Sequence, residues 1–408
     1  MPRFRIPSTS PFYIVMLGLL SALPPLATDI GLPAIPALQA AFHVGIGTAT
    51  HTLTVFLAGF SVGPVLFGPL SDRYGRKPVL LSGLALFALT AFACAAANDI
   101  AALLLVRFVQ GIAAGAAAAL PAAIVRDVFS GHVALSRQSY VALVNAVAPL
   151  VAPLIGAGIL QLGDWRLIYA CLGAIGCALL LLGFLGYEET RPQAAAARAA
   201  GGVFGTAFAA YRQVLGNRHY LIHAALLAAS FGTMFAYITG SSAVFIDQLG
   251  VSGAAYGGLF ALTAAGTIAG AATGERLARA RGAHRPLVGS VVGSAIVNVL
   301  LLAAAVLGTT SIPLIAACVV ASNFCAGIVM PNATHQALDT VGHVAGSAAA
   351  LLRSMQMLAG AGTGALVGLL AGNRLTAMAG VMTLAALAGL VLLRARRVNG
   401  VRSARVAS

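Results

Sequence analysis

The stretch that decides the fold is Gly68-Pro-Leu-Ser-Asp-Arg-Tyr-Gly-Arg-Lys-Pro78, which lies between two long apolar runs and contains Lys77, the only lysine of the chain. Five ionisable side chains and two glycines fall within this short segment. A basic, charged connection between two apolar runs is typical of a cytoplasmic turn between membrane helices. The stretch therefore predicts a membrane protein and identifies one of its inward-facing turns.

The composition supports the same prediction. Of the 408 residues, 60% are hydrophobic and only 8% are charged, with a mean hydropathy of +0.94, whereas a soluble domain carries about 25% charged residues. Apolar windows of about 20 residues, the length that crosses a bilayer as a helix, recur along the chain. We predict an all-α membrane protein with twelve transmembrane helices, at residues 12–35, 47–69, 79–97, 100–122, 139–161, 166–187, 220–240, 256–275, 287–307, 312–334, 344–371 and 375–394.

The basic residues predict the orientation of these helices. All 24 of them except Arg107, Arg166, Arg353 and Arg374 fall on one side of the predicted topology. Lys and Arg accumulate in cytoplasmic loops, so we expect both termini in the cytoplasm. The net charge of +14 is then a topology signal, and no nucleic-acid partner is implied.

The longest polar interval divides the chain into two six-helix halves. Each half has a basic loop after its second helix, at Ser71–Pro78 and at Glu275–Pro286. This correspondence indicates an internal duplication, as in many secondary transporters. The predicted parts are an N-terminal half (1–187), a cytoplasmic linker (188–219), a C-terminal half (220–394) and a basic cytoplasmic tail (395–408).

Signatures of enzymes and metal sites are absent from the sequence. The five cysteines lie inside apolar spans without metal-ligand spacing, and the eight histidines show none either. No phosphate-binding glycine motif is present. We therefore expect no enzyme activity, no metal and no cofactor, with energy taken from an ion or substrate gradient.

Three charged residues are predicted to lie within the membrane: Asp29, Arg107 and Arg353. Such residues are costly in a bilayer and are functional candidates by default. At 1.5 Å per residue, Asp29 and Arg107 reach similar depths in the outer half of the membrane. They are placed to form an ion pair or to compete for one proton or ligand; a static structural pair is the alternative. Arg353 lies closer to its helix end, from which a long side chain reaches the interface.

Uncharged polar residues also lie within the predicted helices. A mostly apolar cavity with a few polar groups suits a small amphiphilic ligand. Helix-packing hydrogen bonds are the alternative for each residue. The predicted substrate cavity consists of Asp29, Gln110, Asn145, Tyr237, Asn323 and Arg353.

Several motifs together resemble one family. The run Gly68 to Lys77 is similar to the loop motif of the major facilitator superfamily, and Arg107-Phe-Val-Gln-Gly111 resembles its fourth-helix motif. The run from Ala148 to Gly158 resembles the antiporter motif of drug exporters, and Leu26 to Pro36 resembles the first-helix signature of the bicyclomycin and chloramphenicol resistance (Bcr/CflA-like) branch. Gly31, usually Tyr in that branch, and Arg353, where a small residue is expected, depart from the pattern.

This resemblance implies drug:proton antiport by alternating access, by a monomer in the bacterial inner membrane. Asp29 would carry the coupling proton and Arg107 would tune its protonation. An antiporter helix motif would comprise Pro149, Pro153 and Gly156. A cytoplasmic latch would comprise Gly68, Asp72, Arg73, Gly75, Arg76, Lys77 and Asp127, whose opposite charges make a breakable lock.

Two alternatives remain open at this point. The same fold and coupling would serve an exporter of an endogenous metabolite such as a sugar or purine, because a fold does not determine its ligand. A membrane sensor without transport is the third reading.

Overall fold

The computed structural model describes residues 6–7, 10–190, 203–370 and 372–406. Within this part of the chain the regular structure is entirely helical. The chain forms two compact units. Unit 1 comprises Met1–Gly45, Val55–Arg212 and Gly346–Ser354, and unit 2 comprises Ile46–Thr54, Gln213–Ala345 and Met355–Ser408.

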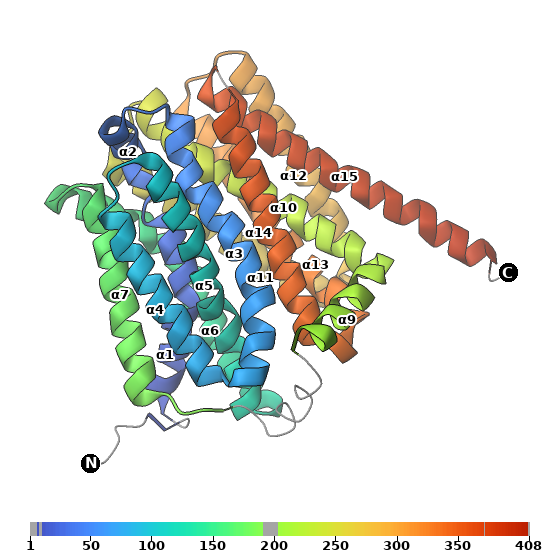
Figure 1. Ribbon diagram of the computed structural model, residues 1–408. Helices are drawn as coiled ribbons and strands as arrows, with labels where there is room; N and C mark the ends of the chain where they lie inside the picture. The colour runs from blue at the N-terminus through green and yellow to red at the C-terminus, as the bar shows by residue number, and fades with distance from the viewer. Residues whose placement is uncertain (1–5, 8–9, 191–202, 371, 407–408) are drawn as a thin grey trace. The chain divides into compact units, whose positions relative to one another are not determined.

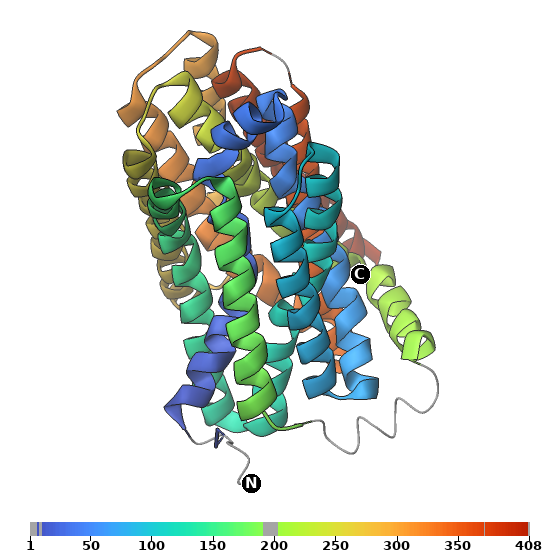
Figure 2. The ribbon, with the colours of Figure 1, turned by 60° about the vertical axis from the view of Figure 1, so that its left-hand side comes forward.

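Unit 1 is built from pairs of long helices packed side by side. Helix α4 packs against α5 and α7, and α1 packs against α6; Figure 2 shows α7 running alongside α4. The elements are α1 (Pro11–Asp29), the 3-10 turn η1 (Leu32–Ala34), α2 (Ile35–Phe42), α3 (Ile46–Tyr74), α4 (Arg76–Ala95), α5 (Ile100–Val128), α6 (Gly131–Leu162), α7 (Trp165–Gly186) and α9 (Val203–Gly216). The first nine residues of α3 belong to unit 2.

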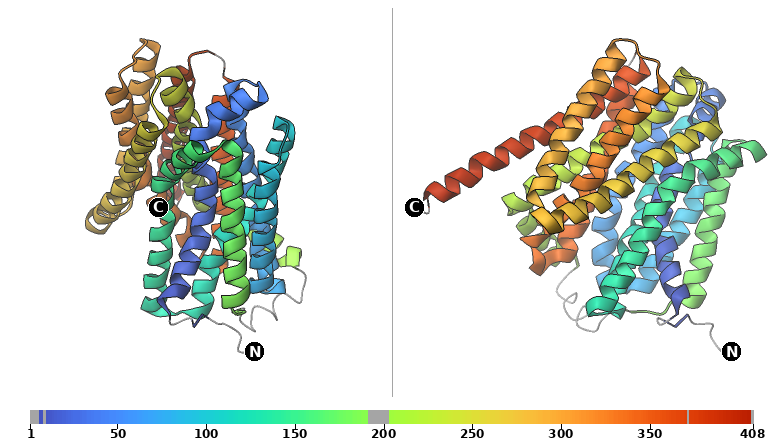
Figure 3. Two further views of the ribbon diagram at one scale, coloured as in Figure 1. Left: turned by 90° about the vertical axis from the view of Figure 1, so that its left-hand side faces the viewer. Right: turned by 180° about the vertical axis from the view of Figure 1, so that it is seen from behind.

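Unit 2 repeats this style of packing. Helix α13 packs against α10, α11 and α12, and α15 packs against α10 and α12. Figure 3 shows α15 as one uninterrupted helix. The elements are α10 (Arg218–Ser242), the π-helical turn η3 (Ala243–Gln248), α11 (Gly253–Arg281), α12 (His284–Val306), α13 (Ile312–Asp339), the 3-10 turn η4 (Gly342–Val344), α14 (Ala345–Leu369) and α15 (Arg374–Val406).

Eleven spans in the described part of the chain are long and apolar enough to cross a membrane. They correspond to eleven of the twelve predicted spans. The remaining predicted span, 344–371, corresponds to helix α14, which has 25 residues. This helix is not among the eleven apolar spans.

The helices extend beyond the apolar windows from which they were predicted. Between α3 and α4 only Gly75 is non-helical, so most of the predicted basic loop is helix. Similarly, α6 begins at Gly131 and not near residue 139, and the predicted linker contains α9. Hydropathy marks only the lipid-buried part of a helix, while backbone hydrogen bonding continues through the charged residues that follow.

Candidate functional site

The first membrane span is broken at Asp29. Helix α1 ends there, and the chain continues through η1 into α2. An unbroken helix would need an N–H at residue 33 to pair with the Asp29 carbonyl, but Pro33 has none. The break therefore follows from the local sequence, and the prediction of one continuous helix over 12–35 is wrong at this point. The break places a carboxylate at a helix end in the middle of a membrane span.

The Asp29 side chain is buried, with 3% of its surface exposed. It makes no hydrogen bond or ion pair with the residues that the structure describes. The predicted ion pair with Arg107 is therefore not formed. A buried carboxyl group without a partner favours its neutral form, which is the state that holds the proton.

Arg107 is 1% exposed and approaches the same helix end through the backbone. Its Nη2 donates to the Ala27 carbonyl oxygen at 3.3 Å, and its Nη1 donates to Gln110 Oε1 at 2.7 Å. Ala27 contributes one of the last four carbonyls of α1, which have no regular intrahelical donor. The guanidinium thus supplies a donor that the broken helix lacks.

Two aromatic rings flank the Arg107 guanidinium. Its Cζ lies 4.3 Å from the centre of the Phe56 ring and 5.5 Å from that of Tyr169. Aromatic faces attract a cation most strongly where water is excluded. Hydrogen bonds and ring faces together hold this cation in the protein interior.

Helix α6 approaches the break at Gly156. A Cβ atom at this position would lie 2.0 Å from the Ile30 carbonyl oxygen, so only glycine allows the approach. Pro149 and Pro153 lie inside the same helix. The predicted antiporter helix motif therefore packs directly against the chain break that carries Asp29.

The remaining predicted cavity residues are divided between the two units. Unit 1 holds Gln110, Asn145 and Arg353, and unit 2 holds Tyr237 and Asn323. Tyr237 is 1% exposed, and its hydroxyl accepts a hydrogen bond from Thr263. A common cavity stays a prediction.

The charged cluster at the α3–α4 turn is centred on Arg76. The Arg76 guanidinium is paired with Asp127 at 2.8 Å and with Asp72 at 2.6 Å, and it also donates to Ser71. Asp127 comes from the end of α5, so the pair ties α5 to the turn. Among the other predicted latch residues, Gly68 provides a carbonyl for the Ser71 hydroxyl, and Arg73 lies over the Tyr74 ring.

Glu189 joins this cluster, although it is not among the residues predicted from the sequence. Its carboxylate accepts hydrogen bonds from the backbone N–H groups of Arg76 (2.8 Å) and Lys77 (3.1 Å). These are unpaired donors at the start of α4, where a helix terminus favours a negative charge. Lys77 in turn donates from Nζ to the carbonyls of Phe184 and Tyr187. The end of α7 is thus fastened to the start of α4.

Gly75 makes this arrangement possible. Its φ of +102° and ψ of 155° lie in a region open essentially only to glycine. A Cβ there would also lie 2.3 Å from Glu189 Oε2. The only sequence signal for Glu189 was its place directly after the sixth span.

The part of the chain that the structure describes holds no group of three or more His, Cys, Asp or Glu side chains that could bind a metal ion. The ionisable groups described above are one buried carboxylate, one buried guanidinium and the charged turn. These groups suit the binding and release of a proton.

Comparison with known proteins shows the family of this chain. The sequence profile of the major facilitator superfamily (MFS) matches residues 17–365. The chain is 33% identical over 382 residues to the uncharacterised MFS-type transporter YdgK of Bacillus subtilis, covering 92% of both proteins. It is 30% identical over 361 residues to a bicyclomycin resistance protein homolog of Haemophilus influenzae, covering 87% of this chain and 88% of the relative.

A solved structure shows the same fold. The xylose transporter XylE from E. coli, in a partially occluded inward-open conformation, matches with a TM-score of 0.66 at 17% identity, over 92% of this chain and 97% of XylE. The matched family and these relatives are transporters and not enzymes. The chain therefore belongs to the major facilitator superfamily and is a multi-pass membrane transporter.

Proposed function

We propose that this transporter exports drug-like small molecules across a bacterial inner membrane in exchange for protons. The observation that carries the proposal is the Asp29 carboxyl group, which is buried at the break between α1 and η1 and has no partner among the residues that the structure describes. The similarity to a bicyclomycin resistance protein homolog supports a drug-like substrate. The protein would act as a monomer with both termini in the cytoplasm, and with no cofactor beyond the proton gradient.

Asp29 carries the coupling proton in this proposal. As the neutral acid it is stable in the protein interior; as the carboxylate it requires water or a cationic group. Outward opening admits a proton from outside, and inward opening releases it. A cationic or polar substrate binds in the deprotonated state, so the proton and the substrate exclude one another.

Arg107 responds to the charge of Asp29 through α1. Its hydrogen bond to Ala27 lies two residues from the carboxyl group. A negative charge at Asp29 attracts the guanidinium, while the neutral acid leaves it on Gln110 and the α1 backbone. Each protonation state thereby favours a different position of the α1 end relative to α5, which is the link that antiport requires.

The cytoplasmic latch acts through the charges of Arg76, Asp72 and Asp127, to which the structure adds Glu189. It fastens the ends of α5 and α7 to the α3–α4 turn through charged hydrogen bonds. Such bonds are strong when formed but exchange readily for water when they open. The latch stabilises one conformation without preventing the other.

The test is proton movement in proteoliposomes with a pH-sensitive dye inside. Addition of bicyclomycin should move protons across the membrane with the wild-type protein and with Glu275→Gln, a matched control whose side chain is 64% exposed. Asp29→Asn should bind the drug yet move no protons. Normal proton movement by Asp29→Asn would reject the carboxyl group as the carrier.

A drug screen in cells lacking other exporters defines the substrate class. The wild-type gene should raise the drug concentration that stops growth, and Asp29→Asn should not. If neither protein protects cells against any drug, but a metabolite drives proton movement in proteoliposomes, the substrate is a metabolite and not a drug.

A further inference from the structure

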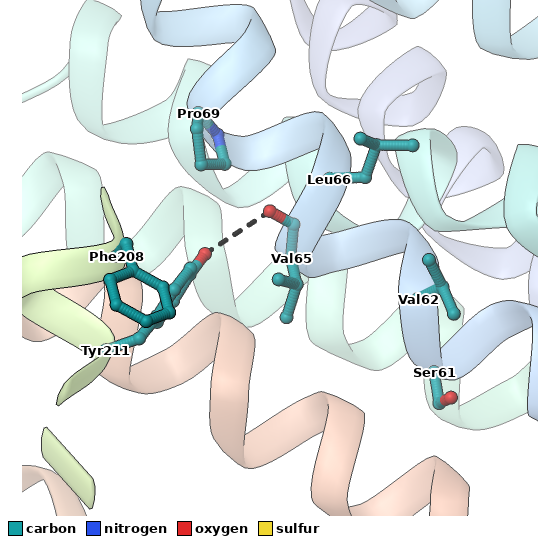
Figure 4. A pocket seen from close by; sticks show the side chains of 7 residues that line it. All are labelled: Ser61, Val62, Val65, Leu66, Pro69, Phe208 and Tyr211. Atoms are coloured by element: carbon teal, nitrogen blue, oxygen red, sulfur yellow. Dashed lines mark hydrogen bonds between the residues drawn. The ribbon is translucent and has the colours of Figure 1, made fainter. Parts of the chain in front are cut away.

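A pocket of about 390 Å³ lies between α3 and α9, within unit 1. Its volume is within the range of ~300–1,000 Å³ for small-molecule sites. Figure 4 shows that α3 provides one wall and α9 the other. The lining residues are Ser61, Val62, Val65, Leu66 and Pro69 from α3, and Phe208 and Tyr211 from α9.

The polar atoms in this lining are already used within the protein. The Ser61 hydroxyl donates to the Ala58 carbonyl at 2.7 Å, and the Tyr211 hydroxyl donates to the Val65 carbonyl at 3.3 Å. Pro69 has no backbone N–H. The pocket therefore presents apolar surface, and its occupant does not need to form hydrogen bonds with the lining.

The bond between Tyr211 and Val65 explains why α9 docks here. The Val65 carbonyl would normally accept the N–H of residue 69, which is proline. A carbonyl without a donor is costly in an apolar surrounding, and Tyr211 supplies the missing donor. Burial raises the pKa of Tyr211 to about 12, so the phenol keeps its proton at neutral pH and the contact persists.

Two lining residues expose apolar side chains, and a basic residue follows the lining in α9. Val62 is 44% exposed on a membrane-spanning helix, and Phe208 is 70% exposed on α9. Arg212 follows Tyr211 directly and is also exposed. A helix that carries exposed apolar and basic residues beside a bilayer lies at the lipid interface.

We propose that this pocket binds one acyl chain of a membrane phospholipid, whose phosphate group pairs with Arg212. The satisfied polar atoms of the lining favour a hydrocarbon chain over a drug, because a drug needs a few polar contacts for its orientation. The adjacent cation favours a phospholipid over a neutral lipid. The bound lipid fills the space under α9 and helps to hold it on α3, next to the latch.

The experiment uses the full-length protein in lipid nanodiscs that contain a phosphatidylglycerol with a photoreactive diazirine on one acyl chain. After irradiation, peptides are identified by mass spectrometry. Peptides that contain Val62–Leu66 or Phe208 should be labelled more strongly than those from other lipid-facing segments. Val62→Trp fills the pocket and should reduce this labelling, whereas Leu89→Trp, on a 68% exposed residue of α4, should not.

A second variant, Arg212→Gln, tests the pairing of the lipid phosphate with Arg212. The preference of the pocket for phosphatidylglycerol over a neutral lipid should fall by about fivefold. Thermal unfolding of each variant checks that it is folded, and Leu66→Trp replaces Val62→Trp if the latter is not. Equal labelling of all lipid-facing segments, or displacement of the label by bicyclomycin, would overturn the proposal. Because labelling does not require transport, its outcome is independent of the proposed drug export.

Discussion

Arg107 Nη2 donates a hydrogen bond to the Ala27 carbonyl oxygen at 3.3 Å, and this contact joins α5 to the last turn of α1. The same guanidinium reaches Gln110 through Nη1. One cation therefore links the helix break beside Asp29 to the body of unit 1. Its planar fork aims two separate nitrogens at the two acceptors, a geometry that the single nitrogen of lysine does not reproduce.

Arg107→Lys should therefore weaken coupling while the positive charge remains. Loss of one hydrogen bond from a charged donor costs about 1.5–3 kcal/mol, which corresponds to a decrease in exchange rate of roughly tenfold or more. The measurement is drug-driven proton movement in proteoliposomes. Wild-type rates in Arg107→Lys would show that charge alone is sufficient and that the contact with Ala27 is incidental.

The two carboxylates that pair with Arg76 should differ in their contribution to stability. Asp127 is 12% exposed and Asp72 is 52% exposed. Loss of the less exposed partner in Asp127→Asn should cost about 1–3 kcal/mol, and Asp72→Asn about 0–1 kcal/mol, as for other exposed pairs. Thermal unfolding in detergent measures both, with Glu275→Gln as the control. Greater destabilisation by Asp72→Asn would contradict this order.

Asp72→Asn should instead act on turnover. Its ion pair with Arg76 spans one turn across the end of α3, so its loss should slow transport and leave drug binding largely intact. Turnover at the wild-type rate would count against a latch role for Asp72.

Gly75 and Glu189 should show coupled energetics. Alanine at the backbone conformation of Gly75 costs about 1–3 kcal/mol, and its Cβ would also meet Glu189 Oε2. Removal of the carboxylate in Glu189→Ala costs about 0.5–2 kcal/mol, as for other helix N-caps. In the double variant the steric conflict is gone, so the combined loss in unfolding free energy should be less than the sum. Additive losses would show that Glu189 moves aside freely.

The charged turn shows what the sequence could and could not predict. Its position and its charge were expected from the local motif, and the involvement of Asp127 was implied by the family resemblance. Glu189 was not, because its contact depends on where α7 ends relative to α4, and hydropathy does not report which span ends are neighbours. The helix bounds at Tyr74 and Arg76 were missed for a related reason, since charged residues continue a helix beyond the apolar window.

The Asp29 region shows the same division. Similar depths for Asp29 and Arg107 were predicted from the topology, but whether the guanidinium meets a carboxylate or a carbonyl depends on the rotation of α1 about its axis. The break itself had a local cause in Pro33. The close approach of α6 is a tertiary feature, and a glycine in a small-residue run does not reveal its partner.

Gly156 provides the sharpest test of that approach. Alanine at this position would place a Cβ 2.0 Å from the Ile30 carbonyl, so α6 must move away from the break. Gly158, in the same helix, has no atom within 4 Å of an added Cβ and is the matched control. Displacements of about 1 Å cost as much as 100-fold in a precisely arranged site.

Gly156→Ala should therefore lose most drug-driven proton movement, and Gly158→Ala should retain it. Thermal unfolding separates a misplaced helix from an unfolded protein, because only a folded Gly156→Ala variant shows an unfolding transition. If both alanine variants exchange protons at the wild-type rate, the contact between α6 and Ile30 serves packing alone, and the role assigned to the break beside Asp29 loses its support from this helix.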